Sequence, residues 1–190
     1  MTHPLEMQRR NMIEYQQIDI QGNNIIIDNE SQMPNYLGEK LFLEEYKEKL
    51  QAQEEGNKEK LADAFGDMLI CIAGAIIEHN IPLEIFSPHF QTKPFELDQV
   101  IVLHEIERIV KRFNTAITKY EKSILLANLW NSVVNEAIDN GFNIEGIYNA
   151  IAENNLARID KDENGKPKRN KETKKIMRKN IHPDLTPFIL

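Results

Sequence analysis

The feature that most constrains the fold is an apolar run of ten residues, 68–77, inside a longer stretch with helical periodicity. A helix that is apolar on every side has to be surrounded by other helices, because no face of it suits water. Ten residues also fall far short of the roughly 20 that a helix needs to span a bilayer. Gly74 lowers the helix propensity of this run, and we explain it by the close approach of a neighbouring helix. The run therefore predicts the central helix of a helical bundle.

Helical periodicity continues along the chain, and strand-like alternation is nearly absent apart from residues 25–27. Turn-forming Gly, Pro and Asn residues separate six predicted helices, at 4–17, 36–53, 58–79, 97–114, 119–140 and 143–157. We expect a single all-α domain, 1–190, whose four-helix-bundle core consists of the hairpins 37–80 and 97–142. After Asp160 the composition turns to Lys, Asn, Gly and Pro. This predicts an irregular, basic C-terminal tail that buries little surface.

The two predicted hairpins resemble each other weakly. The segment 61–69, Leu-Ala-Asp-Ala-Phe-Gly-Asp-Met-Leu, is echoed by 126–134, Leu-Ala-Asn-Leu-Trp-Asn-Ser-Val-Val. An internal pseudo-duplication explains this echo, and so does the general similarity of amphipathic helices, so both explanations remain open. The acidic residues of the first hairpin are replaced in the second by His104, Arg108, Asn128 and Ser132. We therefore expect the second hairpin to be degenerate and to bind no metal.

Charge is unevenly distributed along the chain. Residues 158–179 carry ten Lys or Arg against four Asp or Glu, a local charge of +6, so the net charge of −7 leaves −13 on the remainder. An acidic body argues against duplex nucleic acid as a partner. It suits carboxylates that hold cations beside a cationic segment that closes over phosphates. A solvated basic tail is the simpler alternative.

The start of the sequence and its cysteine content bear on location. The first residues show no basic segment followed by an apolar run, so no secretory signal is readable. The single cysteine, Cys71, lies inside the apolar run and has no second cysteine to pair with. We expect a reducing, cytoplasmic setting and no membrane partner.

Five acidic residues converge if the first hairpin folds as predicted: Glu44, Glu45, Glu48, Asp63 and Asp67. The three glutamates fall within one arc of about 100° on their helix, and the two aspartates are one turn apart on the next. A short connection around Gly56 makes the two helices antiparallel, so that their acidic ends face each other. Such carboxylates repel unless cations lie between them, and oxygen ligands suit Mg²⁺ or Mn²⁺ better than Zn²⁺. A metal site and a solvated acidic face both remain open at this point.

The acidic residues stand in a pattern that resembles a known family. Glu44-Glu45-x-x-Glu48 followed by Leu61-Ala-Asp63-Ala-Phe-Gly-Asp67-Met-Leu resembles the E-E-x-x-E and E-x-x-D helices of the all-α nucleoside triphosphate pyrophosphatases, the MazG-like and phosphoribosyl-ATP pyrophosphohydrolase-like proteins. The C-terminal segments Asn155-Leu-Ala-Arg158, Asp162-Glu-Asn-Gly165-Lys-Pro and Pro183-Asp184-Leu are similar to the tail of a phage and bacterial branch. The resemblance covers about 37–80 and 142–190. The sequence departs from the pattern at Lys60, which stands where the E-x-x-D glutamate is expected.

The resemblance implies an enzyme that hydrolyses a (deoxy)nucleoside triphosphate to the monophosphate and pyrophosphate, with Mg²⁺ as cofactor or Mn²⁺ as an alternative. It implies that the five carboxylates bind the metal, that Glu45 and Glu48 are catalytic, and that Glu45 takes the proton of the attacking water. Substrate contacts then fall to the closing segment 143–190, through Asn155, Arg158, Lys161, Lys166 and Lys175. Because one glutamate is missing, a catalytically degenerate module that binds a nucleotide or a protein is the alternative. The base, the sugar and the existence of a homodimer are left open.

Overall fold

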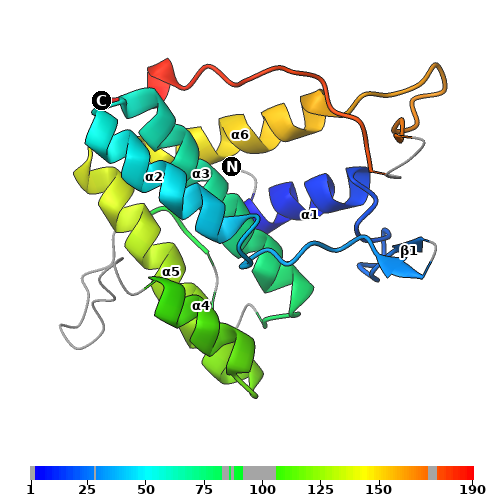
Figure 1. Ribbon diagram of the computed structural model, residues 1–190, viewed down its shortest axis with the longest axis horizontal. Coiled ribbons are helices and arrows are strands. Elements are labelled where there is room, and N and C mark those ends of the chain that lie inside the picture. The colour runs from blue at the N-terminus through cyan, green and yellow to red at the C-terminus, as the bar shows by residue number, and fades with distance from the viewer. Residues whose placement is uncertain (1–2, 28, 83–85, 87, 92–105, 171–174) are drawn as a thin grey trace.

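The computed structural model describes residues 3–27, 29–82, 86, 88–91, 106–170 and 175–190. Within these ranges the chain forms six α-helices and one antiparallel pair of short strands (Figure 1). The helices are α1 (Pro4–Glu14), α2 (Phe42–Glu55), α3 (Lys58–Glu78), α4 (Ile106–Thr115), α5 (Lys119–Asp139) and α6 (Ile144–Arg158). The strands are β1 (Ile26–Ile27) and β2 (Glu30–Ser31), and a short 3₁₀ helix covers Thr186–Phe188. The predicted all-α class is confirmed, and none of the described helices is long and apolar enough to cross a membrane.

Local sequence signals account for several helix ends. Gly56 ends α2 in the left-handed conformation, with φ at 64°. The side chain of Asn57 then begins α3 by accepting a hydrogen bond from the backbone N–H of Lys60 at 3.0 Å. Thr118 and Glu121 form a capping box at the start of α5. Gly56 and Asn57 together fix the tight turn that makes α2 and α3 antiparallel neighbours.

Two predicted helix ends are wrong. α1 stops at Glu14 instead of residue 17, because Gln16 adopts a left-handed φ of 53° that breaks the helix. α2 begins at Phe42 instead of residue 36, because residues 36–41 form a series of turns. Helical periodicity in a short apolar stretch does not distinguish these turns from a first helical turn.

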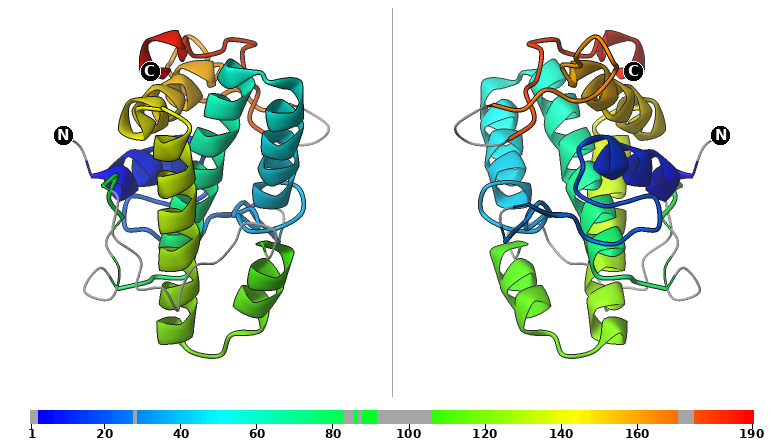
Figure 2. Two further views of the ribbon diagram at one scale, coloured as in Figure 1. Left: turned by 90° about the vertical axis from the view of Figure 1, so that its left-hand side faces the viewer. Right: turned by 90° about the vertical axis from the view of Figure 1, so that its right-hand side faces the viewer.

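α3 occupies the centre of the bundle, where it contacts α1, α2, α5 and α6 (Figure 1, Figure 2). Every residue from 68 to 76 is buried, as the apolar run predicts. The reason for Gly74 differs from our expectation, because a Cβ there would collide with the ring of Tyr36 in the turns before α2. The close helix neighbour lies instead at Gly66, where a Cβ would collide with Ile151 of α6.

The second predicted hairpin is described from residue 106 onward. α4 and α5 pack against each other, α5 packs on α3, and α3 and α5 are both 21 residues long. An ion pair between the buried Lys49 of α2 and Glu136 of α5 ties the two hairpins together. The predicted helix segment 97–105, with His104, lies outside the described residues, whereas Arg108 is exposed and Ser132 is buried. The pseudo-duplication stays a prediction.

The tail is irregular, as expected, but it folds back on itself. Isolated bridges pair Ile159 with Arg178 and Arg169 with Ile176, so the chain after α6 forms a loose hairpin. This hairpin lies beside the N-terminal part of the chain, since Arg169 donates a hydrogen bond through Nε to Gln16 Oε1 at 3.1 Å. The basic segment therefore has a defined place over α1.

The segment 185–190 returns to the bundle beside the start of α6. The backbone N–H of Asn143 donates to the carbonyl of Phe188 at 2.8 Å. Leu185 is buried, and the Phe188 ring occupies the space above Gly146, where a Cβ would collide with it. The expectation that the whole tail buries little surface is wrong for this segment, because its apolar side chains dock on the bundle.

Candidate active site

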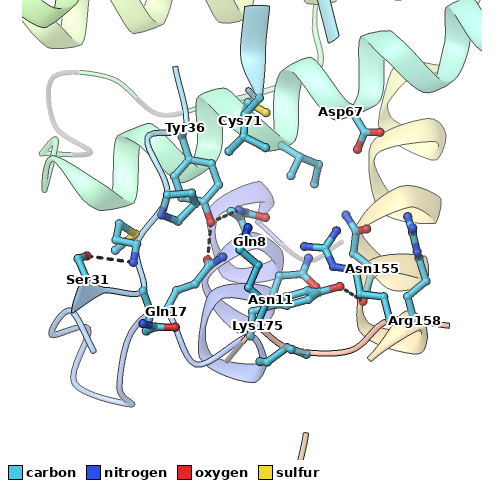
Figure 3. Close-up of a pocket in the computed structure, with 18 of the residues that line it drawn as sticks. Gln8, Asn11, Gln17, Ser31, Tyr36, Asp67, Cys71, Asn155, Arg158 and Lys175 are labelled. Atoms are coloured by element: carbon cyan, nitrogen blue, oxygen red, sulfur yellow. Dashed lines mark hydrogen bonds between the residues drawn. The ribbon is translucent and has the colours of Figure 1, made fainter. Parts of the chain in front are cut away.

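A pocket of about 970 Å³ lies where α1, α2, α3, α6 and the tail meet (Figure 3). Residues predicted for the site and found in its wall are Glu45, Asp67, Asn155, Arg158 and Lys175. They come from the α2–α3 hairpin, the end of α6 and the tail, which are distant in the sequence. Pockets for small ligands and cofactors span roughly 300–1,000 Å³, so this one is large enough for a cofactor-sized molecule.

Glu45 is at the centre of the acidic cluster. Burial and nearby negative charge raise its pKa to about 8, with burial as the larger cause. The neighbouring charges are, in order of their effect, Asp67, Glu48, Asp63 and Glu44. An electrostatic effect from each of these residues requires that all four lie near Glu45. The fold thus gathers the five carboxylates that the sequence singles out.

Asp67 shares this environment from the side of α3. Burial raises its pKa to about 7, Asp63 adds to the rise, and the positive charge of Arg158 opposes it. The pKa of Asp63, one turn earlier, is also raised by burial, and His182 and Arg158 oppose that rise. Asp67 lines the pocket and Asp63 lies outside its wall. Both aspartates therefore lie near Arg158, Asp67 in the pocket wall and Asp63 outside it.

The other two glutamates of the motif are exposed. Glu44 and Glu48 are exposed on α2 and lie outside the pocket wall. Lys60, which replaces the expected glutamate, forms an ion pair with Glu55 at 3.0 Å. Among the described residues of α3, the carboxylates whose charge acts on Glu45 are therefore those of Asp63 and Asp67.

Cationic side chains line the pocket beside the carboxylates. Arg158 is half-buried, and within the described part of the chain its Nε has no hydrogen-bond partner. Arg178 lies over the ring of Tyr15, 4.7 Å from its centroid, and the Tyr15 hydroxyl donates to the carbonyl of Asn155 at 2.8 Å. These contacts hold the end of α6 and the tail against α1. The pocket is thus acidic on the α2–α3 side and cationic on the α6 and tail side.

Two predicted substrate contacts lie outside the pocket wall. Lys161 pairs with Glu14 at 2.8 Å, and Lys166 is exposed on the tail hairpin. Arg169 and Arg178, which our sequence analysis did not single out, line the pocket. The local charge of +6 locates the basic segment, but the direction of each cation depends on the pairing of the tail hairpin. No short-range pattern in the sequence specifies that pairing.

α1 contributes polar residues that the sequence analysis missed. Gln8 and Asn11 are buried and line the pocket together with Gln17 and Tyr36. The available signal is their position on the buried face of α1, where they interrupt an otherwise apolar stripe that includes Met7. A polar interruption of such a stripe indicates either a satisfied core hydrogen bond or a binding residue.

The cluster suits a hard divalent cation in its chemistry, because all of its donors are carboxylate oxygens. Burial and neighbouring carboxylates raise the pKa values of Glu45 and Asp67, and a cation bound between them would oppose that rise. Among the residues that the structure describes, however, no group of three or more His, Cys, Asp or Glu side chains is positioned to hold a metal ion. The exposed side chains of Glu44 and Glu48 would have to turn inward to complete a site. The residues therefore fit a metal ion by type but not yet by position.

The hairpin of α2 and α3, with its E-E-x-x-E segment and two aspartates, is the part of the structure on which the chain resembles the all-α nucleoside triphosphate pyrophosphatases. Residues 27–93 match the family model described as phosphoribosyl-ATP pyrophosphohydrolase, which is part of this class. The matched segment contains α2, α3 and all five carboxylates, and it spans a little over a third of the chain. The resemblance predicted from the sequence is confirmed, and the family is one of pyrophosphohydrolases.

The other two comparisons give no relative. No curated protein and no solved structure shows a significant match to this chain.

Proposed function

We propose that this protein is a Mg²⁺-dependent pyrophosphohydrolase that cleaves a (deoxy)nucleoside triphosphate into the monophosphate and pyrophosphate. The observation that carries the proposal is the pair of carboxylates Glu45 and Asp67 in the wall of one cofactor-sized pocket, opposite its arginines, with Glu44, Glu48 and Asp63 near them. A triphosphate with its divalent cations suits both sides, since cations meet the carboxylates and phosphates meet the arginines. The family match over the same hairpin supports a pyrophosphohydrolase.

The five carboxylates, Glu44, Glu45, Glu48, Asp63 and Asp67, would hold Mg²⁺. When bound, this ion would neutralise phosphate charge and lower the pKa of a coordinated water. Glu45 would accept the proton of the attacking water, because it reaches the pocket and would be ionised once Mg²⁺ opposes the negative charge of its four acidic neighbours. Glu48, the second catalytic candidate, would add negative charge beside Glu45 and so help to hold the cation.

The cationic wall would bind the phosphates. The Nε of Arg158 has no partner among the residues that the structure describes, and its charge acts on both aspartates, so Arg158 is the first candidate for a phosphate contact. Lys175 would add a second charge, and Asn155 would hydrogen-bond the substrate. Lys161 and Lys166 would reach a ligand only after a movement of the tail. A cytoplasmic setting, in which Cys71 stays reduced, completes the proposal.

Product analysis tests the proposed reaction. The purified protein is incubated with nucleoside triphosphates and Mg²⁺, and pyrophosphate and monophosphate are both measured. We expect the two products in equal amounts, and none in excess chelator. Asp67→Asn should lower kcat by about 100-fold or more, whereas the exposed Glu54→Gln on α2 should leave kcat unchanged.

Three outcomes would count against the proposal. Release of pyrophosphate that persists in excess chelator would exclude the metal-dependent mechanism. Release of orthophosphate would place the cleavage at a different bond. Nucleotide binding without any turnover would favour the degenerate binding module instead.

A further inference from the structure

Asn11 is a buried amide whose hydrogen-bonding groups are unused. The residue is 4% exposed, and among the described residues neither its Oδ1 nor its Nδ2 has a partner. Buried side-chain amides are almost always hydrogen-bonded, because leaving them unpaired costs stability. Asn11 is one of the residues that line the pocket, on the side of α1 (Figure 3). The wall that it belongs to, α1, lies outside the segment matched by the family model.

Gln8, one turn earlier on α1, is oriented by a chain of hydrogen bonds. The Tyr36 hydroxyl donates its proton to Gln17 Oε1 at 2.6 Å, so it accepts the bond from Gln8 Nε2 at 3.3 Å. This arrangement assigns the nitrogen of the Gln8 amide to Tyr36 and leaves its oxygen on the other side. Gln8 is 2% exposed, and its Oε1 has no partner within the described part of the chain. A fixed acceptor therefore stands beside the unused amide of Asn11.

The amide groups of Asn11 and Gln8 that lack a partner among the described residues suit a ligand that presents a hydrogen-bond donor and an acceptor side by side. Asn11 offers a donor and an acceptor side by side, and Gln8 adds a further acceptor. Phosphate oxygens are poor partners for two acceptors, and the pocket already places its cations elsewhere, at Arg158 and in the tail. A nucleobase presents an N–H beside an acceptor on its polar edge, which is the pattern that carboxamide side chains pair with. Apolar side chains elsewhere in the lining of the pocket, including Met33 and Ile70, suit the faces of a flat ring.

We propose that Asn11 and Gln8 recognise the nucleobase of the substrate, with an N–H of the base donating to Gln8 Oε1 and the Asn11 amide pairing with the adjacent donor and acceptor. This inference rests on the proposed function and names the part of the pocket that selects among nucleotides. The carboxylates and arginines bind the common triphosphate, and α1 distinguishes the bases. A base with the wrong edge leaves these buried amides unpaired, and that loss supplies the discrimination.

The test measures binding, so that it does not depend on turnover. Calorimetry is carried out in Mg²⁺ with the α,β-methylene analogues of ATP, GTP, CTP and UTP, and with inorganic tripolyphosphate as a probe that has no base. Wild-type protein should prefer one base by about 10-fold or more. Asn11→Leu, which keeps the size and removes the amide, should weaken binding of that analogue by about 10- to 100-fold and level the preference. Its affinity for tripolyphosphate should not change.

Two further variants separate recognition from folding. Gln8→Met removes the fixed acceptor by a second route, and Gln51→Met changes an exposed amide on α2 that bonds only to Glu55. Asn11→Leu should melt at the wild-type temperature or above it, because it replaces an unpaired buried amide with an apolar group. Weaker binding of the preferred analogue combined with undiminished stability is a result that a purely structural amide does not give. The Gln51→Met control should match wild type in every measurement.

The outcomes distinguish this inference from the proposed function. Equal loss of affinity for every analogue and for tripolyphosphate would overturn the assignment of α1 to the base, as would an unchanged base preference in both variants. Wild-type protein that binds none of the analogues would overturn it as well. Selective binding of one analogue that Asn11→Leu abolishes, together with no release of pyrophosphate from the natural triphosphates, would support the base site and refute the hydrolase.

Discussion

The substitution Glu45→Gln is expected to stabilise the metal-free protein at neutral and alkaline pH. Glutamine has nearly the same shape as glutamate and lacks the charge that four neighbouring carboxylates oppose. Folding raises the pKa of Glu45 from 4.5 to about 8. Because the folded-state value lies above the unfolded one, ionised Glu45 opposes folding. This cost is absent below the unfolded pKa and grows as the pH rises from about 4.5 to about 8.

The size of the effect follows from the same two values. A rise from 4.5 to about 8 corresponds to about 5 kcal/mol at full ionisation, and to about 3 kcal/mol at pH 7, where folded Glu45 is mostly protonated. Glu45 is only partly buried, so water and salt screen its neighbours and reduce this upper bound. We expect a net gain of about 1–2 kcal/mol for Glu45→Gln. For a chain of this size that is a rise in Tm of about 3–6 °C.

Thermal unfolding followed by circular dichroism measures this gain. Wild type, Glu45→Gln and the exposed control Glu54→Gln are compared in chelator at pH 5 and pH 8. The gain should appear at pH 8, nearly vanish at pH 5 and be absent in the control. Saturating Mg²⁺ should stabilise wild type more than the variant, because a ligand that binds the folded state raises its stability. An equal gain at both pH values, or a loss at pH 8, would refute burial of Glu45 among like charges.

Three further predictions concern other parts of the molecule. Arg158→Met should raise KM for a triphosphate by about 10-fold or more, and Lys161→Met should leave it nearly unchanged; steady-state kinetics measures both, and equal effects would contradict the assigned wall. Gly74→Ala should lower the free energy of unfolding by about 1–3 kcal/mol, because the added methyl group collides with Tyr36; denaturant titration without a loss would contradict this packing. Deletion of residues 185–190 should lower Tm, since it uncovers the start of α6, and an unchanged Tm would mean that this segment does not dock.

The parts of the fold that follow from the sequence are those with short-range causes. α3 is predictable because its apolar run admits only a central position, and the α2–α3 turn is predictable from Gly56 and Asn57. The acidic cluster follows from both, since helical spacing and an antiparallel turn suffice to bring Glu45 and Asp67 together.

The remaining parts depend on contacts between distant segments. Tyr36 explains Gly74, yet nothing near Gly74 in the sequence indicates a ring from the turns before α2. Gln8 and Asn11 are ordinary polar residues of a short helix until the fold buries them. Lys161 is as basic as its neighbours, and only its ion pair with Glu14 takes it away from the pocket. Such pairings are set by the whole chain and leave no local pattern.

The hydrogen bond between Arg169 and Gln16 joins a segment that is synthesised early to one that is synthesised late. The ribosome releases α1, α2 and α3 long before the cations that line the opposite wall, and domains fold as their segments emerge. A nascent chain that has reached the middle of α6 can already cover its central helix, but its acidic cluster still lacks Arg158 and the tail hairpin. A chain stalled there would have the helix content of the bundle with only half of the pocket. The pocket is thus completed last, by residues more than 150 positions away from those that begin it.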